Sequence, residues 1–412
     1  MNSHNRGGSG GARPSGLDPV DSLQRNMRFD LPSVLVSIKD GVIDLGWGHP
    51  SSRLHPIEAI RMASEKLLAS DDSTPLQYGA TQGFGPFLES LSGFLSRQPA
   101  YGIPVDPRHL FLTAGASQGL DLACTLYAPA GSTVVVEEPT YFVIEKIFRD
   151  RGLNVVGVPT DSQGMLVSEL ENLLLDGLKP SILYIIPAFQ NPTGFCLSND
   201  RRGQLISLAN KFDFRILADE VYQLIHFDEL PPRPFLAFDE GNRVISFGSF
   251  SKILAPGLRT GWIHAAPEII KKFSDAALTF SGGGFNHYSS ALIREVIDLG
   301  LLDTHVSVLR EEYSVRSDAM HKALQFYFGK EIEYTRPSGV YYFWLTFPEG
   351  FDSDRLLTSA EKAGVSYRPG NAFSESGKFS KQIRLAYTLF EVEELKEGIS
   401  RLHEAYSEYS IE

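Results

Sequence analysis

Short apolar runs alternate with helical stretches through the middle of this chain. Runs rich in Val, Ile, Leu and Phe end in turn residues at positions 110–113, 134–138, 183–187, 214–219 and 244–247. Continuous runs of this length are typical of strands that are buried on both faces of a parallel sheet. Because helical stretches separate them, we predict an α/β fold. Its large domain should hold a mostly parallel, seven-stranded-type sheet flanked by helices.

The pattern changes toward both ends of the sequence. Helical spacing at residues 56–69 opens the large domain, and one long helical region at residues 291–328 leads out of it. That region should bury Leu309, Tyr313, Met320 and Leu324. Strand-like runs follow at residues 340–345, 365–370 and 382–387. We therefore predict a smaller α+β domain built from the N-terminal segment and the C-terminal third.

The expected domain boundaries follow from these changes in pattern. Residues 1–18 form a flexible Gly/Ser-rich head, 19–50 an N-terminal segment that joins the small domain, 51–298 the large, cofactor-binding domain, and 299–412 the small domain.

Composition narrows the class of protein. Of the 412 residues 42% are hydrophobic and 21% charged, as in a soluble globular protein. The net charge of −12 argues against a nucleic-acid partner or an anionic membrane partner. Only Cys124 and Cys196 occur, which suits a reducing compartment and supplies neither a disulfide framework nor a metal site. With no apolar run of membrane-spanning length and no signal core, we expect a cytoplasmic protein.

Lys252 is the strongest candidate for chemistry. It follows the buried run 244–247 within a Ser/Gly-rich turn. A lysine there loses hydration, so its pKa falls and its amine can attack an aldehyde. Ser249 and Arg259 supply a hydroxyl and a guanidinium that suit a phosphate dianion. Together they suggest pyridoxal phosphate held as a Schiff base on Lys252. The alternative is a solvated loop lysine, which is the usual state of a lone lysine.

Two further charged residues stand inside apolar runs and need partners. Asp219 ends the run 214–219, and a protonated ring nitrogen would offset the cost of its burial. The alternative is that Asp219 caps a following helix. Arg384 lies inside an apolar run and matches a carboxylate in two-point contact, with a structural salt bridge as the alternative. Arg368 is expected to be structural.

The stretch S-F-S-K-I-L-A-P-G-L-R resembles the S-x-x-K…R signature of fold-type I pyridoxal-phosphate enzymes, the aspartate-aminotransferase superfamily. The likeness is greatest to the branch of aminoadipate, kynurenine and aromatic aminotransferases. Positions that match the family occur in family order along nearly the whole chain: Tyr78, Gly115, Tyr141, Asn191, Asp219, Tyr222, Lys252, Arg259 and Arg384.

The resemblance implies roles for these residues. Lys252, Asp219 and Tyr222 would be catalytic, with Lys252 moving the proton at the substrate Cα. The expected cofactor contacts are Gly115, Ala116, Ser117, Gln118, Tyr141, Asn191, Asp219, Tyr222, Ser249, Ser251, Lys252 and Arg259. The expected substrate contacts are Arg384, Asn191 and the backbone N–H of Gly48. Tyr78 would reach the cofactor phosphate of a neighbouring subunit, which makes the active unit a homodimer.

Several of these positions have simpler interpretations. The turn at Gly115 could be an ordinary strand-to-helix junction, Tyr141 a core tyrosine, and the turn at Gly48 a plain strand exit. The implied reaction is transamination between an amino acid and a 2-oxo acid, with glutamate and 2-oxoglutarate as one couple. The alternative is another carbanion reaction of the same cofactor: elimination, replacement, decarboxylation, oxidation or carbon–carbon bond formation.

A different class of function is a DNA-binding regulator that uses this fold as a ligand sensor. Such a regulator needs a basic helical module, which the Gly-rich head does not resemble. The side chain of the substrate is not specified, and Arg25 and Arg28 are the candidates for binding a second carboxylate. The glycines at 282–284 stand where many relatives have bulkier residues near the substrate entrance.

Overall fold

The computed structural model of the protein describes residues 34–36, 39–69, 71–227, 229–239, 241–374 and 376–409. The predicted head at residues 1–18, together with Arg25 and Arg28, lies outside the described residues. The elements given below all belong to residues 40–409.

The central sheet has eight strands in the order β2-β9-β8-β7-β6-β3-β4-β5. Strands β8, β7, β6, β3 and β4 are parallel, whereas β9 is antiparallel to both of its neighbours. The bounds are β2 (Leu110–Thr113), β3 (Thr133–Glu138), β4 (Asn154–Asp161), β5 (Gly164–Met165), β6 (Pro180–Ile185), β7 (Arg215–Asp219), β8 (Val244–Ser249) and β9 (Gly261–Ala265). The mostly parallel sheet is confirmed, and the two-residue β5 is the strand beyond the expected seven.

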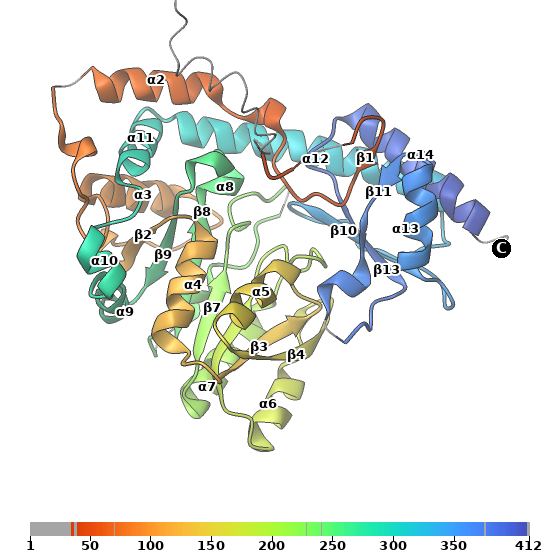
Figure 1. Ribbon diagram of the computed structural model, residues 1–412, viewed down its shortest axis with the longest axis horizontal. Helices are drawn as coiled ribbons and strands as arrows, with labels where there is room; N and C mark the ends of the chain where they lie inside the picture. Colours follow the sequence, from red (N-terminus) through yellow and green to blue (C-terminus); the bar gives the residue numbers. More distant parts are fainter. Residues whose placement is uncertain are drawn as a thin grey trace, which may run out of the picture. The chain divides into compact units, whose positions relative to one another are not determined.

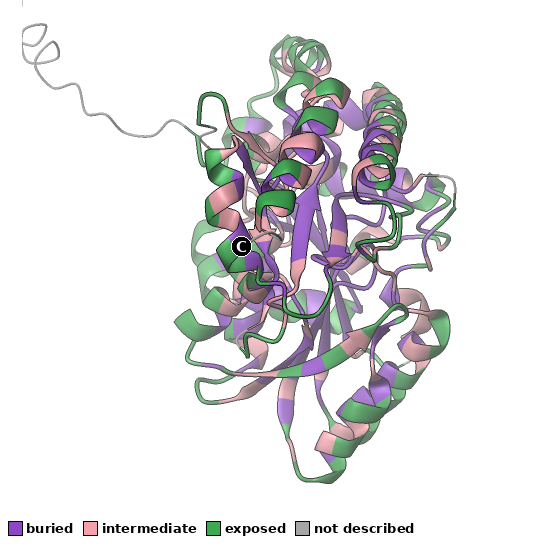
Figure 2. Cartoon of the chain, turned by 90° about the vertical axis from the view of Figure 1, so that its right-hand side faces the viewer, coloured by how far each residue is buried: buried purple, intermediate pink, exposed green. Residues whose placement is uncertain are grey.

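Both faces of this sheet are buried. Along β3, Val134 and Val136 belong to one hydrophobic cluster and Val135 to the other, and the same alternation separates Ile216 from Leu217 on β7. Successive side chains of a strand point to opposite faces. A sheet covered on both faces therefore produces the continuous apolar runs seen in the sequence. Figure 2 shows the buried strands enclosed by helices whose outer faces are exposed.

Helices cover the sheet and continue beyond it (Figure 1). Their bounds are α2 (Ile57–Leu68), α3 (Gly85–Arg97), α4 (Ala116–Tyr127), α5 (Phe142–Asp150), α6 (Val167–Leu175), α7 (Asn199–Phe212), α8 (Phe250–Ile253), α9 (Pro267–Ser274) and α10 (Ala277–Gly282). Short 3₁₀ helices are η1 (Ser52–Leu54), η2 (Thr74–Leu76), η3 (Pro107–His109), η4 (Phe235–Phe238), η5 (Pro256–Leu258) and η6 (Gly370–Phe373). No helix among the described residues is long and apolar enough to cross a membrane.

The long helical region is two helices, not one. α11 (His287–Asp298) and α12 (Leu301–Phe328) are separated at Gly300, whose φ of +71° lies in the left-handed region. Glycine adopts that conformation without the steric penalty of a Cβ, so the chain turns there. The predicted residues Leu309, Tyr313, Met320 and Leu324 are buried on α12. In Figure 1, α12 runs from beside α11 to α14.

Two small sheets complete the fold. The antiparallel one has the order β10 (Tyr342–Thr346), β13 (Gln382–Ala386), β12 (Arg368–Pro369), and the parallel one pairs β1 (Ile43–Asp44) with β11 (Val365–Ser366). The run expected as one strand at residues 365–370 therefore forms two strands. α13 (Ser353–Lys362) and α14 (Val392–Tyr409) pack beside these sheets. The division into a large and a small domain stays a prediction.

Candidate active site

The topology brings the predicted site residues to one edge of the central sheet. β3, β6, β7 and β8 are parallel, so the loops that follow them meet at their shared carboxyl ends. Tyr141 follows β3, Asn191 follows β6, Asp219 ends β7, and Lys252 lies on α8 directly after β8. Gly115 follows β2, which runs in the same direction. Residues far apart in sequence thus become neighbours.

Lys252 is partly buried rather than solvated. Its Nζ donates a hydrogen bond to the Gly48 carbonyl at 3.4 Å. The same atom lies 5.0 Å from the ring centre of Tyr341 and 5.8 Å from that of Tyr222. Burial lowers the pKa of Lys252 to about 8, against the opposing charge of Asp219. A larger share of this amine is therefore neutral near pH 7 than of an ordinary lysine, which is what a nucleophilic amine requires.

Asp219 offers a carboxylate oxygen without a partner. The residue is 7% exposed, and its Oδ2 accepts a hydrogen bond of 2.8 Å from the Tyr184 hydroxyl. Its Oδ1 is buried and has no hydrogen-bond donor among the described residues. Burial raises the pKa of Asp219 to about 6, although the Tyr184 hydrogen bond, the Val221 backbone N–H and the Lys252 charge oppose this. A turn follows instead of a helix, so the alternative of a helix cap is wrong.

Tyr184, which donates to Asp219, is a neighbour of the site that the sequence analysis did not single out. It lies in β6 beside β7 and is fully buried. A tyrosine inside an otherwise aliphatic run was a usable signal, because a buried phenol needs a hydrogen-bond partner.

Arg384 faces no acid. The residue is 3% exposed, its Nη1 donates to Asn191 Oδ1 at 2.7 Å, and its Nη2 donates to the Gly46 carbonyl at 2.7 Å. Its Nε is buried without a partner, and none of the described carboxylates forms an ion pair with it. The alternative of a structural salt bridge is therefore wrong for the described part of the chain. Burial lowers the pKa of Arg384, and an anionic ligand would offset the cost of burying its charge.

Tyr342 also escaped the sequence analysis, where it was only part of a strand. Its hydroxyl lies 3.3 Å from the hydroxyl of Tyr222 and accepts from Asn191 Nδ2 at 3.4 Å. Its ring lies under the guanidinium of Arg384, with Cζ 4.2 Å from the ring centre. A Cβ on Gly48 would overlap the Tyr342 hydroxyl, so glycine is required there. Nothing in the sequence separates Tyr342 from a core aromatic residue.

His49 is a third missed neighbour. Burial, reinforced by the charges of Lys252 and Arg384, lowers the pKa of His49 to about 4. The imidazole is therefore neutral at physiological pH, and its Nδ1 has no hydrogen-bond partner among the described residues.

A cup suited to a phosphate forms around Arg259. Its Nη1 donates to Ser251 Oγ at 3.3 Å, and its Nη2 donates to the Ala114 carbonyl at 3.4 Å. Gly115 has a φ of +88°, and a Cβ there would lie 2.7 Å from Arg259 Nη2. The positive φ favours glycine at this turn, whereas the guanidinium could move aside for a Cβ. Ser249 is buried, and its Oγ accepts from the Ser251 N–H at 3.1 Å, which leaves its own proton to donate.

The first turn of α4 adds backbone donors to this cup. Ala116, Ser117 and Gln118 open the helix, where N–H groups lack partners within the helix. Ser117 is exposed, whereas Gln118 Oε1 accepts from the Ala114 N–H at 3.0 Å. The oxygen of the Gln118 side chain therefore fixes the turn, and the Gln118 side-chain amide group and backbone N–H remain as donors for a ligand.

Asn191 sits in a loop held by Gln190. Gln190 Oε1 accepts from the N–H and the hydroxyl of Thr193, at 2.9 and 2.8 Å, and its Nε2 donates to the Pro139 carbonyl at 2.8 Å. Tyr141, at the start of α5, is partly buried, and burial raises its pKa to about 12.

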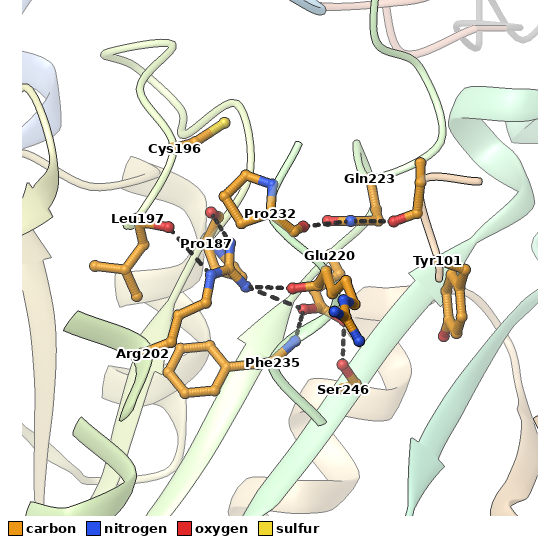
Figure 3. Close-up of polar contacts among 12 residues, drawn as sticks. Tyr101, Pro187, Cys196, Leu197, Arg202, Glu220, Gln223, Pro232, Phe235 and Ser246 are labelled. Atoms are coloured by element: carbon orange, nitrogen blue, oxygen red, sulfur yellow. Dashed lines mark hydrogen bonds and ion pairs between the residues drawn. The ribbon is translucent and has the colours of Figure 1, made fainter. Parts of the chain in front are cut away.

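A buried ion pair between Arg202 and Glu220 helps to hold the segments that carry the site residues (Figure 3). Arg202 of α7 lies 3.9 Å from Glu220, and its other donors reach the carbonyls of Pro187 and Leu197 at 2.6 and 3.1 Å. Glu220 accepts from the Phe235 N–H at 2.6 Å and from the Ser246 hydroxyl. The pair thus ties the end of β7 to the loop that carries Asn191.

Tyr78 is the predicted residue that the fold does not bring to this site. Its side chain is 89% exposed. The adjacent Gly79 forms a backbone bridge with Gly284. A Cβ on Gly283 would lie 2.5 Å from the Gly79 carbonyl oxygen, and one on Gly284 would overlap that of Ala80. Gly283 and Gly284 therefore allow two backbone segments to touch, whereas a Cβ on Gly282 would meet nothing within 4 Å.

These residues fit the predicted cofactor. A partly neutral lysine, an unpartnered buried carboxylate oxygen and a guanidinium beside hydroxyls and a helix start match its aldehyde, ring nitrogen and phosphate, respectively. Arg384, without a counter-ion, matches a substrate carboxylate.

Comparison with known proteins agrees with this geometry. Residues 40–402 match the family model of aminotransferase class I and II. The chain is 36% identical over 378 residues to aromatic-amino-acid aminotransferase 1 of Thermococcus litoralis, covering 91% of this chain and 90% of that protein.

Solved structures extend the likeness. Kynurenine aminotransferase of Pyrococcus horikoshii in complex with PMP is similar with a TM-score of 0.84 and 33% identity, covering 96% of each chain. α-Aminoadipate aminotransferase of Thermus thermophilus, complexed with N-(5'-phosphopyridoxyl)-L-leucine, has a TM-score of 0.79 and 28% identity, covering 90% of this chain and 94% of that one. The chain belongs to the aminotransferase class I and II family, and it is a pyridoxal-phosphate-dependent aminotransferase acting on an amino acid and a 2-oxo acid.

Proposed function

We propose that Lys252 is the residue that carries pyridoxal phosphate and transfers the proton at the substrate Cα. The observation that carries this proposal is the buried Lys252 amine, held between the Gly48 carbonyl and the Tyr341 ring with a lowered pKa, together with Asp219, whose Oδ1 has no hydrogen-bond partner among the described residues. When bound, the cofactor withdraws electrons from the substrate Cα. Asp219 would keep the ring nitrogen protonated, with Tyr184 holding the carboxylate in place. Tyr222 would donate to the ring oxygen together with Asn191.

The remaining residues divide between phosphate and substrate. Ser249, Ser251, Arg259 and the first turn of α4 would bind the phosphate. Tyr141 would stack on the ring. Arg384 and Asn191 would bind the α-carboxylate of the substrate, close to the backbone of Gly48.

Substitution of Lys252 tests this proposal. Lys252→Ala should lower transamination by at least about 10²- to 10⁴-fold, the usual contribution of a general base. Borohydride treatment of the wild-type protein, followed by peptide mass mapping, should place the cofactor mass on Lys252. Finding that mass on another lysine would contradict the proposal.

We propose glutamate and 2-oxoglutarate as one of the substrate couples. Other carbanion reactions of the cofactor would release ammonia or carbon dioxide, or join carbons. Stoichiometric transfer of ¹⁵N from the amino acid to the 2-oxo acid, without free ammonia, is the expected result. Release of free ammonia in step with substrate loss would favour elimination instead.

We also propose that the active unit is a homodimer. The side chains of Leu76, Leu278 and Phe280 are 72%, 62% and 78% exposed like that of Tyr78, and the Gly79–Gly284 bridge joins the two segments on which these residues lie. Apolar residues gathered on a surface mark interaction sites. Sedimentation velocity should show a dimer, and a monomer at micromolar concentration would contradict this. The cytoplasmic location likewise stays a prediction, which cell fractionation would test.

A further inference from the structure

Arg368 is a second arginine next to Arg384. It lies in β12, and its direct partner across the antiparallel ladder is Arg384 itself. Directly opposed residues of such a pair place their side chains on the same face of the sheet, with Cβ atoms roughly 4.5–5.5 Å apart. Two like charges in this arrangement repel each other, and the charge of Arg368 contributes to the lowered pKa of Arg384.

No acid of the described chain relieves this repulsion. Neither guanidinium forms an ion pair with a described carboxylate. Arg368 also donates no hydrogen bond within the described residues, and its buried Nε has no partner there. A structural salt bridge of Arg368 would require such a partner. Two unpaired, adjacent guanidinium groups instead suit a ligand with two negative charges.

Aromatic rings hold Arg368 in a fixed place. Its Cζ lies 5.5 Å from the ring centre of Trp47 and 5.5 Å from that of Phe142. Stacking of this kind uses the flat faces of the guanidinium and leaves its N–H edges free to donate. Both rings belong to the candidate site, because Trp47 lies between Gly46 and Gly48 and Phe142 follows Tyr141.

We infer that Arg368 binds the distal carboxylate of a dicarboxylic amino acid or 2-oxo acid whose α-carboxylate is bound by Arg384. This inference rests on the role proposed above for Arg384. It makes Arg368 a specificity-determining residue that favours dicarboxylic over monocarboxylic substrates. It also replaces Arg25 and Arg28 as the candidates for the second carboxylate.

Binding of two acids that differ only in the distal group tests the inference directly. Glutarate and pentanoate have the same number of carbons, and each can be titrated into the cofactor-loaded protein by calorimetry. Arg368→Gln should weaken the binding of glutarate about 10- to 100-fold more than the binding of pentanoate, because a hydrogen-bonded charge pair with the distal carboxylate is lost. Arg368→Lys keeps the positive charge but not the two-point geometry of the guanidinium, so it should lose less glutarate affinity than Arg368→Gln.

Arg243→Gln is the matched control. Arg243 pairs with Asp213 at 2.5 Å and precedes β8, at the edge of the sheet opposite the site. This variant also removes one positive charge, yet it should keep the preference for glutarate. The ratio of kcat/KM for 2-oxoglutarate to that for 2-oxopentanoate, at one fixed amino donor, should follow the binding data in all variants.

The possible outcomes are distinct. If Arg368→Gln weakens the binding of both acids equally, or the binding of neither, the inference is overturned. Loss of the glutarate preference in Arg243→Gln as well would show a general effect of charge and overturn it too. A wild-type protein that binds glutarate through Arg368 but transfers no amino group to 2-oxoglutarate would leave the inference standing and overturn the proposed glutamate and 2-oxoglutarate couple.

Discussion

A single buried carboxylate, that of Asp219, links catalysis to stability. In the folded protein without cofactor its pKa is raised from 3.8 to about 6. The folded state therefore binds this proton more tightly than the unfolded state does. The contribution to stability is fully present below pH 4 and is lost as the pH rises through about 6.

Asp219→Asn should consequently stabilise the cofactor-free protein at neutral pH. The gain is on the order of 3 kcal/mol above pH 6 and should vanish below about pH 4. Urea unfolding of both proteins at several pH values measures it. Asp275→Asn serves as the control, because the side chain of Asp275 is 60% exposed. A gain for Asp219→Asn that did not depend on pH would contradict the linkage.

The same substitution should damage catalysis. Removing a charge-stabilising group from an active site usually costs about 10²- to 10³-fold in kcat. Asp219→Asn should therefore be a more stable apoprotein and a poorer enzyme, a combination that thermal melting and amino-transfer assays can detect on one preparation.

Residue types and their positions in apolar runs predicted much of the site, but not all of it. Lys252, Asp219 and Arg384 were identifiable because a charged side chain in an apolar run needs a partner. Tyr342 and His49 were not, since their importance comes only from a strand and a loop that contact the site from elsewhere in the chain. The role now proposed for Arg368 could not be argued from sequence for a related reason: the lack of an acid partner among the described residues is visible only in three dimensions.

Helix α7 stabilises the site through Arg202. Arg202→Met would leave Glu220 buried without a cation, which typically costs about 3–5 kcal/mol. Arg61 of α2 pairs with Glu65 at 2.8 Å on the surface, with both side chains more than half exposed, and Arg61→Met should cost no more than about 1 kcal/mol. Urea unfolding compares the two. Adding Glu220→Gln to Arg202→Met should restore part of the loss, and equal costs for the two arginines would contradict this account.

Two glycines at and just after the end of α10, Gly282 and Gly284, should respond differently to an added methyl group. Gly284→Ala would overlap the Ala80 carbonyl oxygen, whereas a Cβ on Gly282 meets nothing within 4 Å. We expect Gly284→Ala to cost about 1–3 kcal/mol and Gly282→Ala to be nearly neutral. Thermal melting measures both. Similar melting temperatures for the two variants would mean that the backbone contact between Gly284 and Ala80 is not tight.

Elements were predicted more reliably than their ends. The parallel strands were clear because both faces are buried, and their runs are short and apolar. The break at Gly300 was missed because apolar periodicity continues on both sides of it, and one glycine inside a helical pattern is often tolerated. The strands β11 and β12 are only two residues long, too short for a periodic signal.

At the scale of the whole molecule, the proposed dimer makes a prediction that one chain alone cannot. Lys252→Ala homodimers should be inactive, and Tyr78→Ala homodimers should bind the cofactor about 10- to 100-fold more weakly, because one hydrogen bond to a charged group is lost. Co-refolding the two variants should create mixed dimers in which one site has both Lys252 and Tyr78. Activity at low cofactor concentration should therefore reappear on mixing. No recovery would place Tyr78 outside the neighbouring site.

The short backbone stretch from Gly46 to Gly48 contacts two charged side chains of the site. The Gly46 carbonyl accepts a hydrogen bond from Arg384, and the Gly48 carbonyl accepts one from Lys252. The other proposed contacts to the cofactor within one chain come from residues 115–259, and none of them needs this stretch. We therefore expect that coenzyme binding and substrate recognition can be separated experimentally. Proteolytic cleavage just before His49 should leave a protein that still binds its coenzyme and keeps its visible absorbance. The guanidinium of Arg384 would lose its fixed orientation, so this form should be inactive.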